Sequence, residues 1–173
     1  MRKFTIGVFF TLAVSILGGL AAVWLGLIDT TTSGRPGRIE TYVASRALDA
    51  AVGRRAANLK NPLAENDGEL IGGMQVYAMN CSSCHGALDK APSALGRSFY
   101  PPAPQLVIRP LDDRDSHIYF IVKHGIRWTG MPSWDDILSD PDIWRVSMFL
   151  GRVANLPPAV QEKMPPPSVA PRR

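Results

Sequence analysis

Cys81-Ser82-Ser83-Cys84-His85 is the stretch that decides the fold of this 173-residue chain. In a C-x-x-C-H run the two thiols can each form a thioether with a vinyl group of one porphyrin, and the adjacent imidazole can bind the iron. The chain contains only these two cysteines, so none is left for a structural disulfide. The motif therefore predicts one covalently attached haem c, held through Cys81 and Cys84.

Two other uses of the C-x-x-C spacing are open at this point. A thioredoxin-type redox pair has the same spacing, but it is expected within a βαβ pattern that this sequence lacks. Half of a zinc site would also use it, but no second Cys/His pair stands at ligand spacing. We favour haem attachment over both.

Met131 is the best candidate for the second axial position of the iron. It lies in Thr129-Gly130-Met131-Pro132, where glycine and proline exclude a regular helix or strand, so a loop can present the thioether. The alternative is that Met131 is an ordinary gap-filling core residue. His117 or His124 could replace it as a ligand, which would make a bis-His centre.

The two motifs together resemble the single-haem domain of the class I cytochromes c, particularly the bacterial membrane-anchored ones, over residues 68–156. The resemblance implies that His85 and Met131 are the axial ligands and that Trp134 contacts the haem. In this family a proline after the haem motif commonly accepts a hydrogen bond from the ligand histidine, which fixes its ring.

The segment Ala91-Pro92-Ser93-Ala94-Leu95-Gly96 resembles that part of the family. It assigns Pro92 as the acceptor for His85 Nδ1–H and Leu95 as a further haem contact. Three other prolines follow closely and leave the choice of acceptor open: Pro101, Pro102 and Pro104.

The expected fold is mainly α: a small class I cytochrome c domain at residues 67–156, around one covalently bound haem. Helical patterns predict helices at about 68–79, 115–124 and 139–153, with Asp115 as one N-cap, Ser139 or Asp140 as another and Gly125 as a stop. No alternating strand pattern appears. The resemblance implies that the first and last helices cross at a small residue beside stacked aromatics, which would be Gly73, Tyr77, Trp144 and Phe149.

Residues 4–28 are uncharged and mostly apolar, and as a helix they would extend about 37 Å against a hydrocarbon core of about 30 Å. Gly19-Leu20-Ala21 could serve as the small-residue cleavage site of a signal peptide, but the apolar run continues beyond it to Ile28. We therefore expect an uncleaved transmembrane anchor. Gly18, Ala22 and Gly26 recur every four positions and could let another membrane helix approach, as in a membrane complex.

The flanking charges do not fix the orientation of this anchor. Bacterial c-type haem is attached outside the cytoplasmic membrane, as the resemblance implies. Residues 1–3 are therefore expected in the cytoplasm, and the haem domain is expected on the periplasmic side of the inner membrane.

Residues 29–66 are predicted to be a linker with an amphipathic helix at about 39–59, where an Ala- and Arg-rich stretch has apolar residues near helical spacing. Its basic residues could meet anionic lipid headgroups, or the helix could pack on the haem domain. Residues 157–173 contain three consecutive prolines and are predicted to be a disordered tail.

The positive net charge of +4 comes from outside the haem domain, largely from the linker and the tail, because residues 67–156 hold eight Lys/Arg against ten Asp/Glu. Since no basic-aromatic face is visible, nucleic acid is not an expected partner. The expected partners are redox proteins, and neither the donor nor the acceptor is indicated by the sequence.

The expected function is single-electron transfer through a haem with His/Met ligation. The chain would act as a membrane-tethered carrier or as the haem subunit of a respiratory or dehydrogenase complex, with no substrate chemistry of its own. The alternative is a haem enzyme or a gas or redox sensor, with an open or labile sixth iron position.

Overall fold

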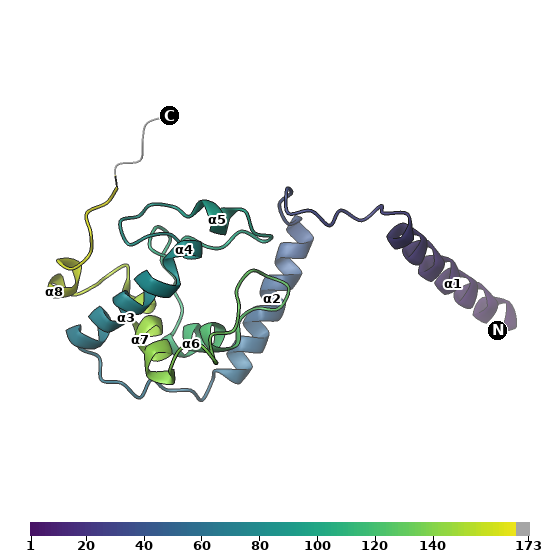
Figure 1. The fold of residues 1–173 in the computed structure, drawn as a ribbon. Helices are drawn as coiled ribbons and strands as arrows, with labels where there is room; N and C mark the ends of the chain where they lie inside the picture. The colour runs from purple at the N-terminus through teal and green to yellow at the C-terminus, as the bar shows by residue number, and fades with distance from the viewer. Residues whose placement is uncertain (169–173) are drawn as a thin grey trace. The chain divides into compact units, whose positions relative to one another are not determined.

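The computed structural model describes residues 1–168, which contain eight helices and no strand (Figure 1). This confirms the expected mainly α fold. The chain forms two compact units, Met1–Thr31 and the remainder. The first unit contains one of the eight helices, and the second contains the other seven.

The first unit is built on α1 (Arg2–Trp24), which has 23 residues, none of them buried. Its mean hydropathy of 2.3 makes it the one helix among residues 1–168 that is long and apolar enough to cross a membrane. The helix ends four residues before the end of the expected 4–28 span.

A glycine explains this early end. Gly26 has a φ of +67°, and its N–H bonds to Val23 O while the N–H of Leu27 bonds to Ala22 O, at 3.1 and 2.9 Å. This is the Schellman pattern that closes many helices with a left-handed glycine. Gly26 therefore lies outside the helix, and the expectation that it shares one helix face with Gly18 was wrong.

Three helices form the core of the second unit: α3 (Asp67–Asn80), α6 (Asp115–His124) and α7 (Asp140–Arg152). α7 packs against both of the others and has the most buried residues, from Ile143 to Leu150. The three predicted helices are confirmed to within about one residue at each end.

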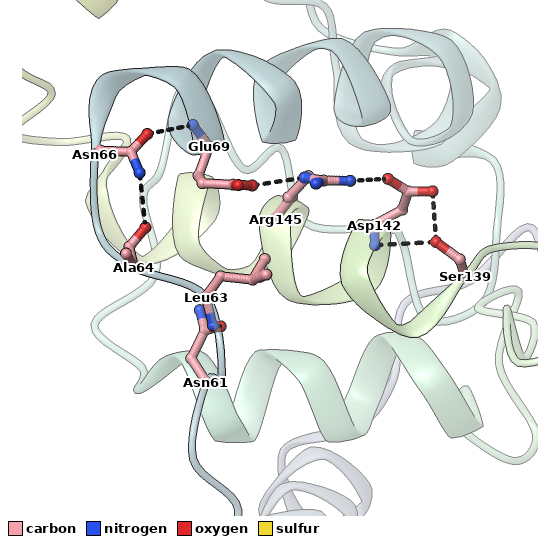
Figure 2. Close-up of polar contacts among 8 residues, drawn as sticks. All are labelled: Asn61, Leu63, Ala64, Asn66, Glu69, Ser139, Asp142 and Arg145. Atoms are coloured by element: carbon pink, nitrogen blue, oxygen red, sulfur yellow. Dashed lines mark hydrogen bonds and ion pairs between the residues drawn. The ribbon is translucent and has the colours of Figure 1, made fainter.

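Side-chain caps fix where α3 and α7 begin (Figure 2). Asn66 Oδ1 accepts from Glu69 N at 3.0 Å, and Ser139 Oγ accepts from Asp142 N at 3.3 Å. Arg145 on α7 then joins the two helices, because its guanidinium donates to Glu69 Oε2 at 2.6 Å and to Asp142 Oδ1 at 2.9 Å. The Glu69 contact links the middle of α7 to the first turn of α3.

The predicted N-cap of α6 was wrong by one position. Arg114 occupies the cap, and Asp115 is the first helical residue. The Asp115 carboxylate instead accepts from Arg152 Nη1 on α7 at 2.7 Å and from Asn61 Nδ2 at 3.3 Å. Asp115 therefore ties the start of α6 to the last turn of α7 and to the segment before α3.

α3 and α7 cross at Gly73, where their backbones touch. A Cβ at Gly73 would overlap the carbonyl of Arg145 and would stand 2.9 Å from Phe149 Cβ. The Tyr77 ring packs on Phe149 one turn further along, with centroids 5.8 Å apart. Trp144 was also expected at this crossing, but its ring stacks on Tyr119 of α6, with centroids 3.9 Å apart.

Gly73→Ala should therefore lower the free energy of unfolding by about 1–3 kcal/mol or more, because the helices must separate to admit the methyl group. The neighbouring Gly72→Ala is the matched control. Its Cβ would meet only the flexible Arg145 side chain, 3.2 Å away at Cδ, and alanine favours the helix by about 1 kcal/mol. Thermal and urea unfolding of the two variants will compare them, and equal stabilities would refute the close crossing.

Two segments outside 67–156 pack on this core. α2 (Arg38–Arg55) lies against α6, with Val52 and the following Ala56 buried, so the linker helix packs on the domain. α8 (Pro158–Gln161) contacts α3, with Val160 fully buried. The prediction of a disordered tail was wrong for α8, and its part at residues 169–173 lies outside the described residues.

Candidate functional site

The haem motif and Met131 line the same cavity. The cavity has a volume of about 590 Å³ and a mainly apolar wall. Cys81, Cys84 and His85 line it from the end of α3 and from α4 (Ser82–His85), while Met131 and Trp134 line it from the loop after α6. The fold thus brings His85 and Met131, which are 46 residues apart in the sequence, to the same cavity.

Backbone and tyrosine hydrogen bonds fix the shape of the motif. The N–H groups of Cys84 and His85 bond to Cys81 O at 3.1 and 2.9 Å, which makes the single turn α4. The buried Tyr77 hydroxyl reaches the carbonyls of His85 at 3.0 Å and Gly86 at 2.7 Å. α3 therefore positions the motif from the same turn that packs on α7.

His85 Nδ1 lies 2.9 Å from Pro104 O. Because a carbonyl only accepts, Nδ1 carries the proton and Nε2 is left free to bind a metal. Burial is the main cause that lowers the pKa of His85, and the Pro104 bond opposes it in part. A neutral imidazole is the form that ligates iron.

The assignment of this acceptor to Pro92 was wrong. After the motif, the chain turns at Gly86 and passes through α5 (Ala94–Arg97) before it returns beside His85, where Leu106 N bonds to His85 O at 3.0 Å. Pro92 lies on the outward part of this loop, and Pro104 lies on the returning part. Leu95, on α5, is 53% exposed and lies outside the cavity lining, so the structure does not place it as a haem contact.

Most of the loop from Phe99 to Pro104 lines the cavity, through Phe99 and the residues from Pro101 to Pro104. Gln105 holds it to the motif: its Nε2 donates to Cys84 O at 3.2 Å, and its Oε1 accepts from Ser93 N at 2.6 Å. Gly96 also touches the motif, because a Cβ there would overlap Cys84 O. Nothing in the sequence distinguished Gln105 from other polar loop residues.

The Cys81 thiol does not have the character of a thioredoxin-type nucleophile. Burial is the main cause that raises the pKa of the Cys81 thiol to about 12. A thioredoxin-type cysteine needs a lowered pKa, because the thiolate is the reactive form. Residues 1–168 form helices and no strand, so this part of the chain also lacks the βαβ unit of that fold.

The Met131 loop is held at the end of α6. The φ of Gly125 is +67°, and a Cβ there would stand 2.6 Å from the carbonyl carbon of Pro132. Met131 N–H donates to Thr129 Oγ1 at 3.1 Å, and Met131 O accepts from Ile126 N at 3.1 Å. Both backbone polar groups of Met131 are therefore hydrogen-bonded, which fixes the backbone that carries its thioether.

The two other histidines lie apart. His117 lines the cavity, with Nδ1 3.8 Å from Asp113 Oδ1, whereas the His124 ring packs on Phe120 and lies outside the lining. Among residues 1–168, no group of three or more His, Cys, Asp or Glu side chains could hold a metal ion. A zinc site at Cys81 and Cys84 thus has no set of further ligands of these types in this part of the chain.

Sequence reasoning allowed the linker helix to pack on the haem domain, but it did not identify this helix as a wall of the cavity. Leu48, Asp49 and Val52 of α2 line it, although α2 precedes the predicted domain. The helical spacing of Leu48 and Val52 predicted a shared apolar face, but spacing cannot identify what covers that face.

The residues present fit a covalently bound haem. Two thiols and one imidazole lie on one turn of helix, and a thioether lies in the same cavity. The volume of about 590 Å³ falls within the roughly 300–1,000 Å³ of small-molecule and cofactor sites, and an apolar wall suits a porphyrin. Cys81 and Cys84 would hold the haem, and His85 would bind its iron.

Comparison with known proteins gives one family match. Residues 69–150 match the family model described as cytochrome c oxidase, cbb3-type, subunit III. No curated protein and no solved structure matches the chain. The matched region includes Cys81, Cys84, His85 and Met131. The domain at residues 69–150 belongs to the class I monohaem c-type cytochromes.

Proposed function

We propose that this chain carries single electrons through a haem c with His85 and Met131 as axial ligands, while α1 anchors it in a membrane. The supporting observation is that the C-x-x-C-H turn and the Met131 loop line one apolar cavity. The bound haem would supply a one-electron Fe(II)/Fe(III) couple. The chain's own residues hold the ligands in place and exclude water.

Each ligand is held by groups that do not depend on the oxidation state. Pro104 O fixes the His85 ring through Nδ1, and Tyr77 fixes the His85 backbone. Thr129 and Ile126 fix the Met131 backbone. A site that is held in this way needs little rearrangement when an electron enters or leaves, which suits an electron carrier.

The test is a redox titration of the purified full chain with carbon monoxide present and absent. We expect a single reversible one-electron step and no carbon monoxide binding by the ferrous protein, because both axial positions are filled by the chain. Ready binding of carbon monoxide would instead support a haem enzyme or gas sensor with an open sixth position.

The side of the membrane and the partners form part of the same proposal. We place the haem domain in the periplasm, where bacterial c-type haem is attached. The matched family is described as an oxidase subunit, so we propose that the chain works within or beside a membrane complex of the respiratory chain. Co-purification from native membranes in mild detergent would identify the neighbours.

The α2 wall leads to a separate prediction. Leu48→Gln should lower the haem reduction potential by tens of millivolts, a small part of the roughly 0.8 V that axial ligation controls, because a polar wall admits water and favours the ferric form. Val43→Gln on the same helix is the control, because Val43 is 58% exposed and lies outside the lining. Equal potentials in both variants would show that α2 does not cover the haem.

A further inference from the structure

The two sides of α2 differ in what they contact. Leu48, Val52 and the following Ala56 face the domain, and Val52 and Ala56 are only 4% and 0% exposed. Ile39 and Val43, in the first half of the helix, are 81% and 58% exposed. Since residues at i, i+4, i+7 and i+11 share one side of a helix, Ile39 and Val43 share a side with residues 46, 50 and 54, opposite Val52.

We define the outer face of α2 as the exposed residues on this side: Ile39, Val43, Arg46, Ala50 and Arg54. It combines apolar and cationic side chains. Tyr42, which is 67% exposed, borders it. Apolar residues flanked by arginines are the composition of helices that lie in the interface of a bilayer.

The cations in and around α2 have no anionic partners in the described protein. Residues 35–60 hold six Lys/Arg against two Asp/Glu, and all six are exposed: Arg35, Arg38, Arg46, Arg54, Arg55 and Lys60. None of the six lies within 4 Å of a carboxylate among residues 1–168.

Three of the eight Lys/Arg in residues 67–156 have carboxylate partners within 4 Å, and Lys123 is one of them. Arg145 pairs with Glu69 and Asp142, and Arg152 pairs with Glu65 and Asp115. The unneutralised positive charge of the linker is therefore concentrated on and beside one helix. An anionic surface is its complement.

The chain length limits where such a surface can be. Only 13 residues, 25–37, separate the end of α1 from the start of α2. Fully extended, they span at most roughly 45 Å, and a flexible chain of this length has a mean span of about 20 Å. If α1 crosses the membrane, as proposed above, the bilayer surface is the nearest extended anionic surface to α2.

We propose that the outer face of α2 binds an anionic lipid surface, with Ile39 and Val43 in the interface and the arginines at the headgroups. The inner face of α2 would at the same time remain the wall of the haem cavity. The helix thus joins the membrane to the haem site, and the domain has one preferred orientation on the bilayer. This inference depends on the proposed anchor.

The test uses the haem-loaded full chain in lipid nanodiscs with a single spin label. The label is introduced by Val43→Cys, and the matched control is Met79→Cys on α3, where Met79 is 75% exposed. In discs that contain phosphatidylglycerol, we expect the Val43 label to be reached by oxygen, which concentrates in lipid, and shielded from an aqueous nickel chelate. The Met79 label should show the reverse.

Changing the charge of the lipid or of α2 shows whether the helix binds anionic lipid or only lies near the bilayer. Pure phosphatidylcholine discs, or the triple change Arg38→Gln, Arg46→Gln and Arg54→Gln, should raise the access of the nickel chelate to the Val43 label several-fold. Equal access at Val43 and Met79 in both lipids would overturn the proposal. Shielding of the Val43 label from both reagents, only in the presence of native partner proteins, would also overturn it in favour of a protein interface.

A third label distinguishes this inference from the anchor itself. Ile16→Cys in α1 should be reached by oxygen in all discs if α1 spans the bilayer. A lipid-exposed label at Ile16 with an aqueous label at Val43 would refute the α2 inference alone. Aqueous labels at both positions would refute the anchor and the inference with it.

Discussion

Replacing Cys81 and Cys84 with alanine should abolish covalent haem attachment completely. The intact chain should retain its haem through acid-acetone extraction and on a denaturing gel, because thioether bonds survive both treatments. The double variant should lose it, since the chain has no other thiol. Haem-stained gels and the extracted pigment measure the difference.

Ser82→Ala with Ser83→Ala is the control for this change. Both serines lie between the cysteines, and Ser82 is in the first turn of α4, so the control alters the same turn and keeps both thiols. Full attachment in the control and none in the cysteine variant would support the proposed linkage. Extractable haem in the unmodified protein would contradict it.

Met131→Ala should leave the haem covalently bound and change its chemistry. The reduction potential should fall by on the order of 200 mV, a fraction of the roughly 0.8 V over which axial ligands set haem potentials, because the thioether favours the ferrous state. The ferrous variant should bind carbon monoxide. The sulfur-to-iron charge-transfer band of the ferric protein should disappear.

Met79→Ala is the matched control, because Met79 is an exposed methionine outside the cavity. It should leave the potential and the band unchanged. If Met131→Ala leaves both unchanged too, Met131 is not the ligand, and His117 is the next residue to replace because it lines the same cavity.

Local sequence signals predicted the helices of the domain well. Ser139 caps the first turn of α7 and Gly125 ends the last turn of α6, so each affects only neighbouring residues. The start of α7 and the end of α6 could therefore be located without knowledge of the fold. The C-x-x-C-H turn is equally local. The family resemblance also predicted that the first and last helices of the domain cross at Gly73, because that crossing requires a small residue.

The errors came from contacts made at a distance along the chain. Pro104 accepts from His85 because the loop after α5 returns to the motif, and the sequence does not show where a loop returns. Val160 is buried although it stands in a proline-rich region, because Pro158 begins α8 and the next apolar residues meet α3. The proline-rich composition of that segment suggested disorder, but its packing against α3 orders it as α8.

The place of α2 has a consequence for how this protein can be divided. The family match begins at residue 69, but the cavity wall begins at Leu48. The part of the chain that the family model matches is therefore shorter than the part that lines the cavity. A protease that cuts the segment between α2 and α3 would spare every proposed ligand and still detach one side of the cavity. A domain transplanted from residue 69 onward would carry the proposed ligands without the α2 wall.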